Sequence, residues 1–75
     1  MNRVEIYDIV TAKVAEVREI KVGRVRSRTK LGDNWGLILM GVGSAVGTNV
    51  SPPRTDAEKM TVDETVNLVQ ELLAS

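Results

Sequence analysis

Residues 17–42, VREIKVGRVRSRTKLGDNWGLILMGV, determine which fold class this sequence predicts. From Val17 to Leu31 apolar and polar residues alternate, and the parity of the alternation slips at Gly23. A period of two is typical of a β-strand, and a glycine at a slip is typical of a bulge or a kink. We therefore predict a strand here, with four basic residues along one face: Arg24, Arg26, Arg28 and Lys30.

A turn and a second apolar segment follow this strand. Residues 31–34 (LGDN) are of the types that form turns. Residues from Trp35 to Val42 are apolar at nearly every position, which is typical of a strand that is covered on both faces. Together the two segments predict a β-hairpin with one basic, edge-like strand and one buried strand.

A helix is predicted before the hairpin. Asn2 followed by Glu5 is a capping box, with Asn in place of the usual Ser or Thr. The apolar residues after it recur at helical spacing, which predicts an amphipathic helix over about residues 3–16.

A second helix is predicted at the C-terminal end. Thr61 with Glu64 is a capping box, and the apolar spacing after it predicts a helix over about residues 61–74. A similar pair at Thr55 and Glu58 predicts a preliminary turn over residues 55–59.

Residues 41–53, GVGSAVGTNVSPP, contain many residues that interrupt regular structure. We interpret this segment as a mobile loop that forms the functional edge of the domain, with Gly41, Gly43 and Gly47 as its flexible positions. A strand followed by glycines is also how phosphate-binding loops begin. Here no Lys-Ser/Thr pair follows and two prolines precede the next helix, so the pattern does not favour nucleotide binding.

The fold class that follows is α+β: one domain over residues 1–75, in the order α-β-β-α, with both helices on one face of the hairpin. A lone hairpin is marginally stable in water. Either residues 43–50 supply a third strand, or two chains pair their hairpins. The second arrangement also buries the apolar strand, so we expect a homodimer.

Composition excludes several classes of function. The chain has 75 residues and contains neither cysteine nor histidine, which removes disulfides, thiolate ligands and the commonest general base. Serines and threonines therefore have no histidine to activate them, and the paired carboxylates near residues 56–64 are better explained as helix caps than as metal ligands. We expect a non-enzymatic protein with no cofactor and no bound metal. Without an apolar run long enough to span a membrane or a signal segment, we expect it in the cytoplasm.

The net charge of zero conceals two oppositely charged segments. Residues 18–30 carry six basic residues and one acid, whereas residues 56–71 carry five acids and one lysine. Such a division is typical of elements that attract each other or a second chain, and also of an anion-binding surface. A nucleic-acid or anionic-ligand site at Arg24, Arg26, Arg28 and Lys30 is the alternative, although the chain has only Tyr7 and Trp35 as aromatic residues for base stacking.

Residues 5–40 resemble the N-terminal domain of the heavy-metal-chelation family. The similarity lies in these residues: Ile6-Tyr7-Asp8, Val17-x-Glu19-x-x-Val22-Gly23, Ser27, Gly32 and Gly36-Leu37. The resemblance implies an α+β fold like the N-terminal domain of enolase. In that family a Rossmann-like domain follows, and we expect this chain to be a stand-alone version without it. The resemblance transfers no metal ligand to any position here, because the chain has no cysteine or histidine.

The sequence thus predicts a small interaction or ligand-binding module that acts as a homodimer or with a separate protein partner.

Overall fold

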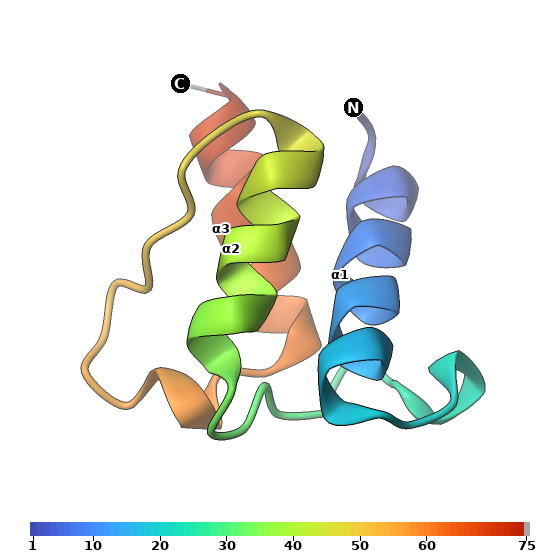
Figure 1. The fold of residues 1–75 in the computed structure, drawn as a ribbon. Helices are drawn as coiled ribbons and strands as arrows, with labels where there is room; N and C mark the ends of the chain where they lie inside the picture. The colour runs from blue at the N-terminus through green and yellow to red at the C-terminus, as the bar shows by residue number, and fades with distance from the viewer. Residues whose placement is uncertain (75) are drawn as a thin grey trace.

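The computed structural model describes residues 1–74, and its regular elements are helices (Figure 1). In chain order they are α1 (Arg3–Arg18), the 3-10 turn η1 (Val22–Arg24), α2 (Trp35–Val46), the 3-10 turn η2 (Ala57–Lys59) and α3 (Val62–Ala74). None of these helices has the length and apolar character that crossing a membrane requires.

The predicted α+β fold is wrong, because the hairpin does not form. The segment expected as the buried strand is α2, and the segment expected as the basic strand is a loop that contains η1. Within residues 1–74 the only β-type pairing is an isolated antiparallel bridge between Lys30 and Thr61. Residues 1–74 therefore contain no hairpin with which a second copy could pair.

The apolar run from Trp35 to Val42 can be a helix because the side chains that it buries in the core all lie on one side of that helix. Ile38, Leu39 and Val42 are buried, as helical spacing requires, whereas Leu37 and Met40 are 58% and 70% exposed. Since the exposed side is apolar as well, the sequence lacks the alternation with polar residues that marks a helix.

Two of the predicted capping boxes are confirmed, whereas the pair at Thr55 and Glu58 forms none: η2 begins after Asp56 with no side-chain cap. At the start of α1 the Asn2 side chain accepts from the Glu5 N–H at 2.9 Å, and Glu5 accepts from the Asn2 N–H at 3.1 Å. Before α3 the Glu64 N–H donates to the Thr61 hydroxyl at 3.2 Å, and the Thr61 N–H donates to the Glu64 carboxylate at 3.3 Å. These reciprocal bonds satisfy N–H groups that have no partner within the helix, so both helix starts were readable from the sequence.

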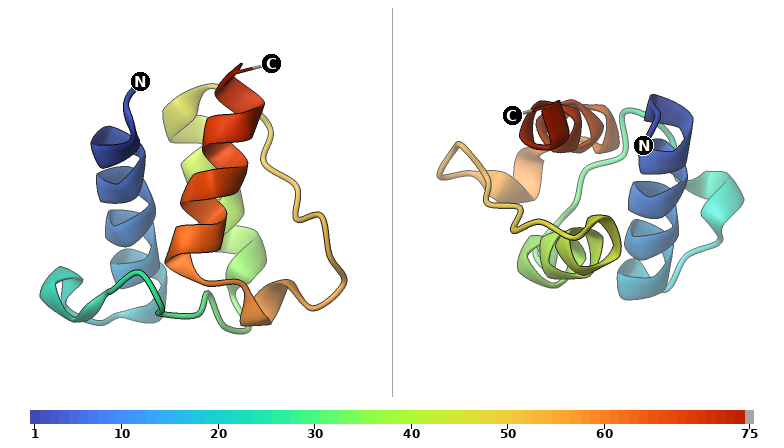
Figure 2. Two further views of the ribbon diagram at one scale, coloured as in Figure 1. Left: turned by 180° about the vertical axis from the view of Figure 1, so that it is seen from behind. Right: turned by 90° about the horizontal axis from the view of Figure 1, so that it is seen from above.

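The three long helices form a bundle in which α1 runs opposite to α2 and α3 (Figure 1). The view from above in Figure 2 places them at the corners of a triangle, and α1 packs against both of the others. Because α2 and α3 run in the same direction, the chain after α2 must return along the whole bundle before α3 begins (Figure 1). The start of α1 and the end of α3 lie at the same end of the bundle (Figure 1).

The predicted loop at 41–53 is wrong in its first half. Gly41 and Gly43 lie inside α2, and Gly47 ends that helix in the left-handed conformation, with φ 77°. Gly43 has a packing role: a Cβ atom there would lie 2.6 Å from the backbone oxygen of Thr48. Further along, Val50 is buried in the core, which ties the returning segment to the bundle.

Replacing Ile38 and Leu37 separately by alanine tests the helical register of α2. Ile38→Ala removes a fully buried side chain, so we expect the free energy of unfolding to fall by about 2–5 kcal/mol. Leu37→Ala removes a side chain that is exposed in the monomer, so it should change the free energy of unfolding of the monomer by less than about 0.5 kcal/mol. Urea unfolding followed by circular dichroism measures both, and equal losses would contradict the helix.

Two glycine substitutions test the contact between α2 and the returning chain. Gly43→Ala forces the Thr48 carbonyl to move and should destabilise the protein. Gly36→Ala meets no atom within 4 Å, so it should stabilise the protein by up to about 1 kcal/mol through helix propensity. Thermal unfolding of the pair should give shifts of opposite sign, and a stabilised Gly43→Ala variant would refute the contact.

Candidate functional site

The most distinctive surface is the outer face of α2, formed by Gly36, Leu37, Met40 and Ser44. All four residues are exposed, and they follow one another at the spacing of one helix face. The helix sequence, WGLILMGVGSAV, contains no charged residue. Two large apolar side chains, Leu37 and Met40, are therefore exposed to solvent between small residues on a helix that has no charged residue.

A shallow groove adjoins this face. It has a volume of about 370 Å³ and lies between the C-terminal half of α2 and residues 47–49. Met40 and Ser44 belong both to the groove and to the outer face of α2, and no charged side chain lines the groove. The uncharged surface thus continues from the helix onto the segment that leaves it.

The predicted basic site residues lie on a loop rather than on a strand. Arg24 ends η1, and Arg26, Arg28 and Lys30 follow on the connection to α2. All four are exposed. The structure keeps them in one segment but does not align them along a strand face, because Arg26 and Thr29 close a turn: the Thr29 N–H donates to the Arg26 carbonyl at 3.0 Å and the Arg26 N–H to the Thr29 hydroxyl at 2.8 Å.

The three predicted loop glycines also separate. Gly41 is half-buried under the side chain of Lys13, Gly43 is buried against the returning chain, and Gly47 is exposed at the end of α2. Only Gly43 and Gly47 line the groove. They shape it by their lack of a side chain. Of the mobile loop predicted over residues 41–53, residues 41–46 are part of a helix.

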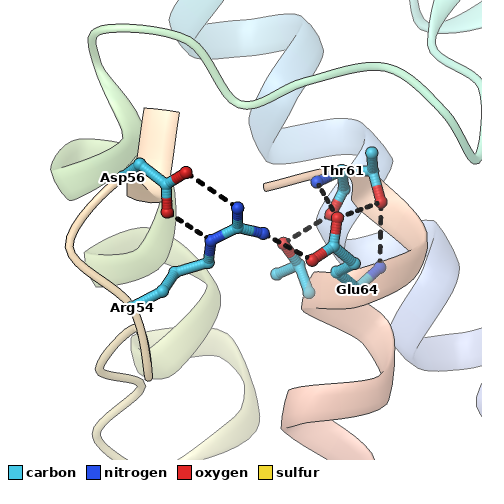
Figure 3. Close-up of polar contacts among 5 residues, drawn as sticks. Arg54, Asp56, Thr61 and Glu64 are labelled. Carbon is cyan, nitrogen blue, oxygen red and sulfur yellow. Dashed lines mark hydrogen bonds and ion pairs between the residues drawn. The ribbon is translucent and has the colours of Figure 1, made fainter. Parts of the chain in front are cut away.

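An ion-pair cluster around Arg54 was not predicted. Figure 3 shows the Arg54 guanidinium between two carboxylates. It donates to both oxygens of Asp56, with Nη2–Oδ2 at 2.8 Å, and Nη1 lies 2.9 Å from Oε2 of Glu64 on α3. Glu64 in turn belongs to the capping box with Thr61, so Arg54 fastens the returning chain to the start of α3. No spacing rule in the sequence connects residues 54 and 64, because the loop between them is irregular.

The ion pair between Arg54 and Asp56 shifts the pKa of both groups. The hydrogen bonds from Arg54 lower the pKa of Asp56 below its ordinary value of 3.8, and Asp56 raises the pKa of Arg54. Both side chains are 38% exposed, so solvent screens the pair and its contribution to stability is modest.

Chemistry by a buried group has no support in the described part of the chain. The buried polar residues are Thr11 and Thr65, and both hydroxyls donate to backbone carbonyls, of Asp8 at 3.1 Å and of Thr61 at 2.9 Å. Within residues 1–74 no group of three or more carboxylates is placed so that it could hold a metal ion.

No protein-family model, no curated protein and no solved structure matches this chain. The resemblance of residues 5–40 to the heavy-metal-chelation family therefore stays a prediction. The sheet that this resemblance implied is absent from residues 1–74, so the resemblance supports no assignment of function.

Leu37 and Met40 are the surface residues that sequence reasoning missed. A signal for them exists: positions 35, 38, 39, 42 and 46 recur at helical spacing and form or pack against the core. The same period leaves positions 36, 37, 40 and 44 on the opposite side. Four glycines over residues 36–47 weakened the case for a helix and hid this signal.

The Arg54–Asp56 pair predicts a pH-dependent effect of Asp56→Asn. Because the pKa of Asp56 is lower in the folded protein than its unfolded value near 3.8, the ionised carboxylate stabilises the fold above that pH. This stabilisation is lost as the pH falls through the folded pKa. Asp56→Asn should therefore lower the melting temperature at pH 7, and the difference from the parent should shrink as the pH falls below 3.8.

Asp33→Asn is the matched control for this comparison. Asp33 is exposed and forms no ion pair within residues 1–74, so its removal should change the melting temperature little at either pH. A gap for Asp56→Asn that stays the same from pH 7 to pH 2.5 would contradict the role assigned to its charge.

Proposed function

We propose that this protein is a non-catalytic interaction module that self-associates through the outer face of α2. The observation that carries the proposal is the exposure of Leu37 and Met40, 58% and 70%, on a helix with no charged residue. Burial of exposed apolar area is the main driving force of association, and no charge of α2 has to lose its water when the face is covered.

A second copy is the occupant that the pattern of side-chain sizes favours. In a twofold arrangement two α2 helices run antiparallel, and the same patch serves both partners. If the two Met40 side chains meet at the axis, Ser44 of one copy faces Gly36 of the other, and Leu37 packs beside this pair of small residues. A large residue beside small ones lets helices interlock, and the flexible thioether of Met adapts to an identical neighbour.

The expected dimer is weak. A helix of 12 residues is about 18 Å long, so one face of α2 offers a contact at the lower end of the size range for specific interfaces. We expect a dissociation constant on the order of micromolar, a range in which monomer and dimer coexist. The earlier expectation of a homodimer thus stays a proposal, with α2 in place of the hairpin as the contact.

Met40→Glu tests this interface directly. In the twofold arrangement the substitution places two carboxylates next to each other, and like charges in an interface cost several kcal/mol. We expect the dimer dissociation constant to rise by about 100-fold or more, measured by sedimentation equilibrium. Circular dichroism should show an unchanged helix content, because Met40 is exposed.

Val4→Glu is the matched control, since Val4 is 68% exposed but lies on α1. It should leave the dimer intact. A parent protein that stays monomeric at several hundred micromolar, or a dimer that Met40→Glu and Val4→Glu weaken equally, would refute the proposal.

A further inference from the structure

The loop between α1 and α2 presents a cluster of positive charge that the α2 contact does not use. Over residues 21–30 it carries five basic residues: Lys21, Arg24, Arg26, Arg28 and Lys30. All five are exposed, and within residues 1–74 none of them forms an ion pair with a carboxylate. We call this segment the basic loop.

The basic loop is held in place by its backbone. The carbonyls of Ser27 and Thr29 accept from the N–H groups of Asp63 and Val62 at the start of α3, both at 2.9 Å. The Lys30 carbonyl accepts from Nη1 of Arg18 at 2.8 Å. Val25 and Leu31 are buried in the core on either side of this stretch.

The anchoring separates the partial negative charges of the loop backbone from its cationic side chains. The carbonyl groups, which carry partial negative charge, point inward to their donors, whereas the cationic side chains lie in solvent. A loop that is already ordered also loses little conformational entropy when it binds a ligand. The five cationic side chains are therefore exposed on an ordered segment of backbone, residues 21–30.

The acidic residue bonded to the basic loop through its backbone, Asp63, has its carboxylate paired with Arg3, and two other acids near the start of α3 pair with Arg54. Figures 1 and 2 place η1 on the outer side of α1, and η2 with the chain before it on the opposite flank of the bundle. Asp56 and Glu64 form the ion pairs with Arg54, and Asp63 forms the one with Arg3. These carboxylates are thus not available to neutralise the basic loop.

The composition of the basic loop favours phosphate groups as its ligand. Three of its five cations are arginines, whose planar guanidinium donates two parallel hydrogen bonds to a phosphate. A protein partner would require buried aromatic or aliphatic anchors, and the exposed apolar side chain here is Val22 alone. A chain of phosphodiesters needs only successive positive charges.

We propose that the basic loop binds the phosphodiester backbone of a nucleic acid without reading its sequence. Self-association and this binding use different surfaces, so a monomeric protein would also show it. A dimer carries two basic loops and would bind a nucleic acid more tightly than a monomer. Each chain still contacts the phosphates through its own basic loop.

Fluorescence anisotropy with a labelled 20-nucleotide oligouridylate and an oligothymidylate of equal length tests the proposal. If four cations contact phosphates, the affinity should fall about 50-fold between 50 and 200 mM salt. Arg24→Gln/Arg26→Gln should weaken binding and lower the slope of log K against log salt by about 1.4. Both residues are exposed, so the variant should fold like the parent, which circular dichroism checks.

Lys13→Gln/Lys59→Gln is the matched control, because it removes the same net charge outside the basic loop. It should leave the affinity and its salt slope nearly unchanged. The proposal is overturned if no binding occurs at 50 mM salt, or if the control weakens binding as much as Arg24→Gln/Arg26→Gln. It is also overturned if polyglutamate or phosphatidylserine vesicles bind more tightly than both oligonucleotides, since the partner would then be an acidic protein or a membrane surface.

Discussion

Burial of the apolar stripe of α1 holds this domain together, because α1 packs against both α2 and α3. Ile6, Val10 and Val14 are 0% exposed and face the centre of the bundle. The chain has no phenylalanine, so the core consists mainly of aliphatic side chains of moderate size. A small domain with such a core needs apolar residues from its connections, and it obtains them from five positions outside the long helices: Val25, Leu31, Val50, Ala57 and Met60.

This shared core explains why α1 and α3 could be predicted and α2 could not. Both predicted helices have polar outer faces and a capping box at their start, so the spacing of apolar residues and the capping box both indicated a helix. The segment that forms α2 has apolar residues on both sides and four glycines over residues 36–47, and local preference favours other structures there. Packing of Ile38 and Val42 into the bundle overrides that preference.

The candidate sites were predictable to different degrees for a related reason. Charge is a property of composition, so the basic segment at residues 18–30 was visible before its conformation was known. Its arrangement as an anchored loop depends on hydrogen bonds to α3, more than thirty residues away in sequence, which no local pattern encodes. Exposure of Leu37 and Met40 depends on which side of α2 meets the core, and that requires the helix to be recognised first.

The contacts between the first and last helices also bear on how the protein is made. Arg3 of α1 donates to Asn67 at 2.7 Å, to Gln70 at 2.6 Å and to Asp63 at 2.6 Å on α3, so residues 60–67 positions apart in the chain must meet. A ribosome releases α1 first, and its apolar stripe has no complete partner until the last helix has emerged. Folding of this domain therefore follows translation of α3, and α1 is the segment of the domain that a nascent-chain chaperone would encounter uncovered.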